Sequence, residues 1–159
     1  MLMIAVFPNI DKENAPMVLR RIVNFYQGKD VKLLMPMDSA KFFDYEAYGV
    51  EDIENHPIDM ALSIGGDGTL LGICRRLYER DIPVCGINIG TFGFLADIEL
   101  PEIESKLEKI IKGQYYFEER MLVSGFVKSG EDDERFLGHA INDVVVTKGG
   151  VARMLHLGL

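Results

Sequence analysis

The chain has 159 residues, of which 48% are hydrophobic and 26% charged, a composition typical of one globular domain or of one domain and part of another. This composition excludes a disordered chain, and no apolar run reaches the ~18 residues that would span a membrane. The net charge of −8 argues against a nucleic acid partner. A small anionic ligand is still compatible with this charge, because backbone amides and a few cations can bind one inside an acidic protein.

Short apolar runs alternate with helical patterns over the first hundred residues. The patterns predict strands at 2–7, 31–35, 60–64 and 83–88, and helices at 15–28, 39–48 and 70–81. Pro16 near the start of the first helix and Gly28 after its last turn mark its ends. Strands that alternate with helices predict a mostly parallel sheet covered on both faces, so we expect a doubly wound α/β domain over 1–100.

The pattern changes after Pro101. A helix is predicted at 101–112, and two long strands are predicted at 115–128 and 134–147. The acidic, glycine-containing segment between these strands predicts a β-hairpin with a solvated tip rather than a metal site. A third strand is predicted at 151–158. We therefore expect residues 101–159 to form an incomplete antiparallel β domain.

The cysteines and the N-terminal segment indicate the compartment. Cys74 and Cys85 have no metal-ligand spacing and are expected to be buried, reduced thiols. The apolar start at 1–7 is too short for a signal peptide and has no basic region before it. We therefore expect a cytoplasmic protein with no metal-ligating cluster of its own side chains.

The segment Gly65-Gly66-Asp67-Gly68-Thr69 lies where a predicted strand ends and a predicted helix begins. Ligands bind at this edge of open α/β sheets, and the free amides of a helix N-terminus favour an anion. Asp67 could accept a proton from a hydroxyl or help to hold Mg²⁺. The alternative is a plain strand–loop–helix turn in which Asp67 caps the helix. The Walker pattern is absent, which excludes phosphoryl transfer of the P-loop type.

Two segments together resemble one kinase family. Gly-Gly-Asp-Gly-Thr is similar to the signature shared by NAD kinases, diacylglycerol-type lipid kinases and 6-phosphofructokinases. The segment at 86–95 resembles the NAD kinase pattern Asn-x-Gly-x-Leu-Gly-Phe-Leu, with Phe92 where leucine is usual. Asn88 offers a donor and an acceptor, and Phe94 can pack on a base or sugar, whereas Phe94 and Leu95 could alternatively be core residues under the loop.

A third segment extends this resemblance. Asn142 and Asp143 form an amide–carboxylate pair in an apolar stretch, where partners across the sheet would be the structural explanation. In NAD kinases a similar pair contacts the bound dinucleotide, so the resemblance implies that this pair binds the ribose and amide ends of NAD. The family also tends to keep a basic side chain at the position of Arg153, often supplied by a neighbouring subunit.

The resemblance implies an NAD kinase, which transfers a phosphoryl group from ATP or polyphosphate to the 2′-hydroxyl of the adenosine ribose of NAD. It implies Asp67 as general base, Mg²⁺ or another divalent cation as cofactor, NAD and ATP or polyphosphate as substrates, and a homo-oligomer with no membrane or nucleic acid partner. A diacylglycerol-type lipid kinase and a non-catalytic dinucleotide-binding module are the alternatives.

The family continues with segments that this sequence lacks, a Gly-Asp-Gly element and a Ser/Thr-Pro-Thr-Gly-Ser-Thr-Ala-Tyr segment. We therefore expect the 159-residue chain to be part of a longer enzyme. On this interpretation it lacks activity by itself and associates through its uncovered β strands.

Overall fold

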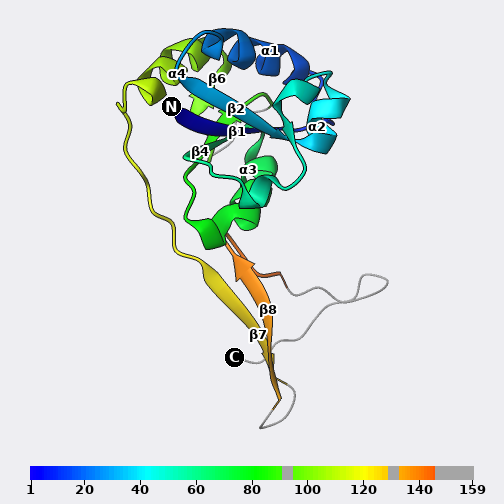
Figure 1. The fold of residues 1–159 in the computed structure, drawn as a ribbon. Helices are drawn as coiled ribbons and strands as arrows, with labels where there is room; N and C mark the ends of the chain where they lie inside the picture. Colours follow the sequence, from blue (N-terminus) through cyan, green and yellow to red (C-terminus); the bar gives the residue numbers. More distant parts are fainter. Residues whose placement is uncertain (91–94, 129–132, 146–159) are drawn as a thin grey trace. The chain divides into compact units, whose positions relative to one another are not determined.

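The computed structural model describes residues 1–90, 95–128 and 133–145 (Figure 1). The chain divides into two compact units, Met1–Glu118 and Glu119–Leu159. Within the described ranges, no helix is both long enough and apolar enough to cross a membrane.

The first unit is built on a parallel sheet, which confirms the predicted doubly wound α/β class. Its strands are β1 (Leu2–Pro8), β2 (Val31–Pro36), β3 (Gly49–Val50), β4 (Met60–Gly65), β5 (Val84–Asn88) and β6 (Ile98–Glu99). They lie in the order β3-β2-β1-β4-β5-β6, and every pair is parallel. The order reverses between β1 and β4, and ligands of open α/β sheets bind beyond the carboxyl ends of strands at such a point.

Helices cover both faces of this sheet (Figure 1). They are α1 (Ala15–Tyr26), α2 (Met37–Phe42), α3 (Asp67–Leu77) and α4 (Ile103–Ile111). The alternation along β1 explains the layers: Ile4 and Val6 pack with α1 and α4, whereas Ala5 and Phe7 pack with α3 on the other face. Strands buried on both faces read as continuous apolar runs, which is why the sequence predicts them well.

Helix α4 lies in the first unit, against α1. The Arg21 guanidinium donates to both carboxylate oxygens of Glu104, over 2.8 and 2.6 Å, and to the carbonyl of Leu100 over 2.9 Å. Ile103 and Leu107 of α4 are fully buried in the same core as α1. The boundary between the two units therefore lies near residue 118 of the chain. The sequence analysis instead assigned the helix at 101–112 to the β-rich domain.

Two predicted helices are shorter than expected. The pattern at 39–48 is α2 followed by a 3₁₀ turn, η1 (Glu46–Tyr48), because Asp44 adopts a left-handed backbone with φ of 60°. The pattern at 70–81 starts earlier, at Asp67. It ends in a 3₁₀ turn, η3 (Tyr78–Arg80), before Asp81, whose φ is 54°.

The second unit contains the predicted hairpin. Strands β7 (Val123–Lys128) and β8 (Glu134–Ala140) pair antiparallel, from Val123 opposite Ala140 to Lys128 opposite Glu134. The strands predicted at 115–128 and 134–147 are therefore too long. Strand pairing is limited to 123–128 and 134–140, because a strand forms only where hydrogen bonds to a partner strand are available. The predicted strand at 151–158 lies outside the described residues.

Candidate active site

The glycine loop joins β4 to α3 as the sequence predicts. Gly65 ends β4, Gly66 is the N-cap of α3, and Asp67 is the first helical residue. Among the described residues no side chain caps this end of the helix, while the amides of Thr69 and Leu70 both donate to the carbonyl of Gly66. The first-turn amides and the positive end of the helix dipole are thus directed at the switch point of the sheet.

The glycines of this loop serve two different purposes. A Cβ on Gly65 would lie 2.3 Å from Thr69 Oγ1, so glycine is required there by the close approach of the helix. A Cβ on Gly66 or Gly68 would meet nothing within 4 Å. The space beside Gly66 and Gly68 is open, which suits the close approach of a ligand to the backbone.

Asn9, which the sequence analysis did not single out, fixes the loop to the end of β1. Its backbone amide donates to the carbonyl of Ile64 over 2.9 Å, and its Nδ2 donates to Thr69 Oγ1 over 2.9 Å. Its Oδ1 accepts the amide of Asp11, also at 2.9 Å. Its position directly after the first strand of a predicted parallel sheet could have identified Asn9 as a site residue, because ligands bind at that edge of the sheet.

Asp67 is half-buried and connects two of the predicted segments. The backbone amide of Leu95 donates to Asp67 Oδ1 over 3.2 Å. Gly66 occupies the cap position, so the structure differs from the alternative in which Asp67 only caps the helix. The amide of Ile89 also donates to the carbonyl of Gly65 over 3.0 Å, which ties the segment after β5 to the glycine loop.

Asn88 is buried and uses both ends of its amide within the chain. Its Oδ1 accepts the amide of Gly90 at 3.1 Å, and its Nδ2 donates to Glu99 Oε1 at 3.2 Å. Asp97, another residue that the sequence analysis did not select, accepts the amide of Gly86 at 3.1 Å. In this state Asn88 shapes the loop that follows β5. Phe94 lies outside the described residues.

An open hollow of about 640 Å³ lies beside the glycine loop. It is formed by the segment after β1, the glycine loop and one face of α3. Its lining consists of Asn9, Lys12, Gly66, Gly68, Thr69, Gly72, Ile73, Arg75 and Arg76. Among the described residues that line it, every charged side chain is basic, although the whole chain carries a net charge of −8.

The predicted site residues of the second unit are exposed. Asn142 and Asp143 follow the end of β8 by one residue and are not part of a strand, and both side chains are exposed. Burial in an apolar strand therefore does not account for this pair. Arg153 lies outside the described residues.

Neither thiol has the lowered pKa that is typical of a nucleophilic cysteine. Burial, together with the nearby Asp97 carboxylate, raises the pKa of Cys85 to about 12, and burial raises the pKa of Cys74. Both are free and half-buried. No group of three or more His, Cys, Asp or Glu side chains is arranged around a metal-sized space in the described ranges.

Known proteins resemble this chain in sequence and in fold. The family model for the ATP-NAD kinase N-terminal domain matches residues 9–115. The NAD kinase of Moorella thermoacetica is 36% identical over 154 residues, which cover 97% of this chain and 49% of that protein. The NAD kinase of Clostridium botulinum is 39% identical over 111 residues, which cover 70% of this chain and 39% of that protein.

A solved structure shares the fold of this chain. Yeast NADH kinase in complex with NADH superposes with a TM-score of 0.70 at 17% identity, covering 89% of this chain and 47% of the yeast chain. The chain spans about half the length of the Moorella relative. Because the family model covers most of the first unit, including the whole glycine loop, this chain belongs to the NAD kinase family.

Proposed function

We propose that the protein phosphorylates the 2′-hydroxyl of the adenosine ribose of NAD, with ATP or polyphosphate as donor, to give NADP. The contact between the Leu95 amide and Asp67 Oδ1 carries this proposal. It brings the phosphotransfer signature together with the segment that distinguishes NAD kinases from lipid kinases. The curated relatives are named NAD kinases, and the family model is the ATP-NAD kinase N-terminal domain.

Asp67 is proposed as the general base. The 2′-oxygen attacks the terminal phosphorus of the donor, the bond from that phosphorus to the leaving phosphate breaks, and the hydroxyl proton passes to the Asp67 carboxylate. The amide of Leu95 holds the carboxylate in one orientation through Oδ1. The amides at the start of α3 face the charge of the transferred group.

Mg²⁺ fits this site as a metal held mainly by the substrate. Mg²⁺ usually binds one or two carboxylates together with phosphate oxygens and water, and Asp67 is the carboxylate that the loop supplies. When bound, the cation offsets phosphate charge.

The remaining predicted site residues are proposed to bind NAD. Asn142 and Asp143 would bond the ribose and amide ends of NAD, Phe94 and Leu95 would pack against the dinucleotide, and Arg153 would lie near it. The exposure of Asn142 and Asp143 supports this role, because neither side chain is used in a core. We also propose that the protein forms a homo-oligomer and acts in the cytoplasm.

The test joins the chain to the C-terminal part of the Moorella thermoacetica NAD kinase, since that relative is about twice as long as the matched region. NADP formation from NAD, ATP and Mg²⁺ is measured with an NADP-specific dehydrogenase. We expect turnover, and Asp67→Asn is expected to lower kcat by about 10²- to 10⁴-fold while the fold is kept.

Three results would contradict the proposal in different ways. A folded chimera that binds NAD without forming NADP would favour a non-catalytic dinucleotide-binding module. Phosphorylation of diacylglycerol vesicles in place of NAD would favour the lipid kinase. If an Asp67→Asn variant keeps more than about a tenth of the activity, Asp67 is not the general base.

A further inference from the structure

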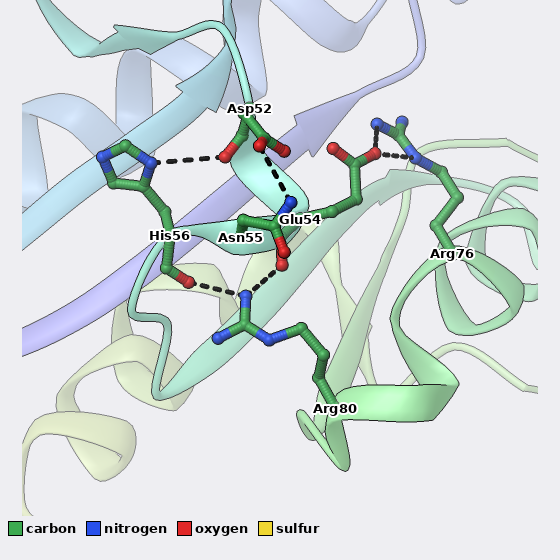
Figure 2. A network of polar contacts seen from close by, with 6 residues as sticks. All are labelled: Asp52, Glu54, Asn55, His56, Arg76 and Arg80. Carbon is green, nitrogen blue, oxygen red and sulfur yellow. Dashed lines mark hydrogen bonds and ion pairs between the residues drawn. The ribbon is translucent and has the colours of Figure 1, made fainter.

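A polar network outside the glycine loop joins the 3₁₀ turn η2 (Ile53–Asn55), which precedes β4, to the end of helix α3 (Figure 2). The Arg80 guanidinium donates to the carbonyls of Glu54 and His56, over 2.7 Å in the case of His56. The side chain of Ile53 is 1% exposed and packs in the same core as α3. Backbone contacts and core packing therefore fix the position of Glu54 beside α3.

The Glu54 carboxylate holds the guanidinium of Arg76. Arg76 Nε and Nη2 both donate to Glu54 Oε1, over 2.9 Å from Nε, and the two side chains point toward one another in Figure 2. The guanidinium carbon also lies 5.4 Å from the centre of the Phe7 ring. The hydrogen bonds from Arg76 hold the pKa of Glu54 below its usual range, so the carboxylate is charged at neutral pH. Two neighbours thus determine where the positive charge of Arg76 lies.

Arg76 also lines the hollow beside the glycine loop, whereas Glu54 does not belong to this lining. The basic residues of the lining are Lys12, Arg75 and Arg76. Among the residues that the structure describes, Arg76 alone of these three forms an ion pair with a carboxylate. Glu54 therefore occupies hydrogen-bond donors, and offsets charge, that an anion in the hollow would otherwise meet.

The stability of the fold is a weak explanation for this ion pair. The side chains of Arg76 and Glu54 are 46% and 38% exposed, and ion pairs of that exposure contribute little to the free energy of unfolding. Their effect on the electrostatic potential of the hollow is more direct, because Arg76 faces that space and its partner is a full negative charge. The pair is thus placed to adjust how strongly the hollow attracts an anion.

We propose that Glu54 is a positioning residue that restrains Arg76 and thereby limits the affinity of the hollow for the phosphoryl donor. The inference rests on the proposed function, in which the charge of the transferred group lies at the start of α3. A donor has to compete with Glu54 for the guanidinium of Arg76, so the cost of breaking the ion pair is subtracted from its binding free energy. Limited affinity suits turnover, because the spent donor has to leave the same hollow.

The test is a calorimetric titration of the 159-residue chain with ATP and with tripolyphosphate, each with Mg²⁺. Glu54→Gln keeps the size of the side chain and removes its charge. Glu104→Gln is the matched control, because it removes the same charge from the ion pair with Arg21, which is not part of the lining. We expect Glu54→Gln to strengthen the binding of the donor compounds about 3- to 10-fold, and Glu104→Gln to change it by less than about twofold.

A second background separates restraint of Arg76 from a general loss of negative charge. In an Arg76→Gln chain, Glu54→Gln should leave the affinities unchanged, because its effect passes through Arg76. An equal gain for ATP and tripolyphosphate supports phosphate as the group that Arg76 meets, and a gain for ATP alone supports restraint toward a nucleoside triphosphate.

Four results overturn the inference. They are unchanged or weaker binding in a folded Glu54→Gln variant, an equal gain in the Arg76→Gln background, an equal gain from Glu104→Gln, and no binding of either compound to the unaltered chain. Circular dichroism melting of each variant shows whether its fold is retained.

The inference and the proposed function fail separately. In an active chimera Glu54→Gln should lower KM for ATP without raising kcat, a pattern that a loss of stability alone does not give. NADP formation with an unchanged KM for ATP in this variant would keep the activity and remove the restraint by Glu54. Tighter tripolyphosphate binding that depends on Arg76, together with no NADP formation by the chimera, would keep the restraint and remove the NAD kinase activity.

Discussion

The first unit and the hairpin of the second unit differ in how far their apolar side chains are buried. In the first unit Ile4, Leu62 and Ile64 are fully buried between a sheet and its helices. In the hairpin, Phe126 is 54% exposed and Leu137 is 52% exposed, and no described residue of 119–145 is buried. A two-stranded sheet without a covering layer is marginal in water, whereas the α/β unit has its own core.

This difference bears on how the site is built. The glycine loop, Asn9 and the segment after β5 are held by hydrogen bonds within the unit that has a core. Asn142 and Asp143 follow strands whose apolar side chains face solvent. Exposed apolar surface of this kind is available to a partner, so association of the 159-residue chain stays a prediction.

The largest expected effect compares one leucine from each unit. Leu62→Ala should lower the free energy of unfolding by about 2–5 kcal/mol, because it leaves a cavity in a closed core. Leu137→Ala should change it by no more than about 0.5 kcal/mol, because that side chain is half-exposed already. Urea denaturation followed by circular dichroism measures both. Equal losses for the two variants would mean that the hairpin has a core of its own.

A second comparison uses two glycines of the same loop. Gly65→Ala should destabilise the protein by about 1–3 kcal/mol, since its Cβ would clash with Thr69. Gly68→Ala should leave thermal stability unchanged or slightly higher, because its Cβ enters open space in the first turn of a helix. We expect Gly68→Ala to weaken ATP binding nonetheless. Normal ATP affinity in this variant would show that no ligand approaches Gly68.

The smallest expected effect lies in the second unit. Asn142→Ala should raise KM for NAD in the chimera with nearly unchanged kcat, by the roughly 0.5–1.5 kcal/mol of a hydrogen bond to a neutral partner. The melting temperature should not change, because the side chain is exposed. An unchanged KM with a lower melting temperature would instead assign Asn142 a structural role.

The sequence predicts the first unit better than the second, for physical reasons. Strands buried on both faces and helices with an apolar stripe leave strong periodic signals, and the Gly-Gly-Asp-Gly-Thr loop lies where those signals change. The two-residue strands β3 and β6 are too short to show any periodicity. The apolar runs at 115–122 and after Ala140 read as strand, yet a strand forms only where a partner lies beside it.

Parts of the site were hidden from sequence patterns because they depend on contacts between distant segments. Nothing local to Asn9 shows that it reaches Thr69, and nothing local to Asp97 shows that it accepts the amide of Gly86. The same holds for Lys12 and Arg75, which become neighbours of one hollow only when β1 and β4 pair.

The proposal that the start of α3, in the first unit, faces the phosphates of the donor is tested most directly by amide hydrogen exchange. Exchange is measured on the 159-residue chain with and without ATP and Mg²⁺. We predict that ATP slows exchange at residues 9–12 and 65–70 and leaves 123–128 and 134–140 unchanged. Slower exchange in the hairpin with no change at the glycine loop would contradict the account.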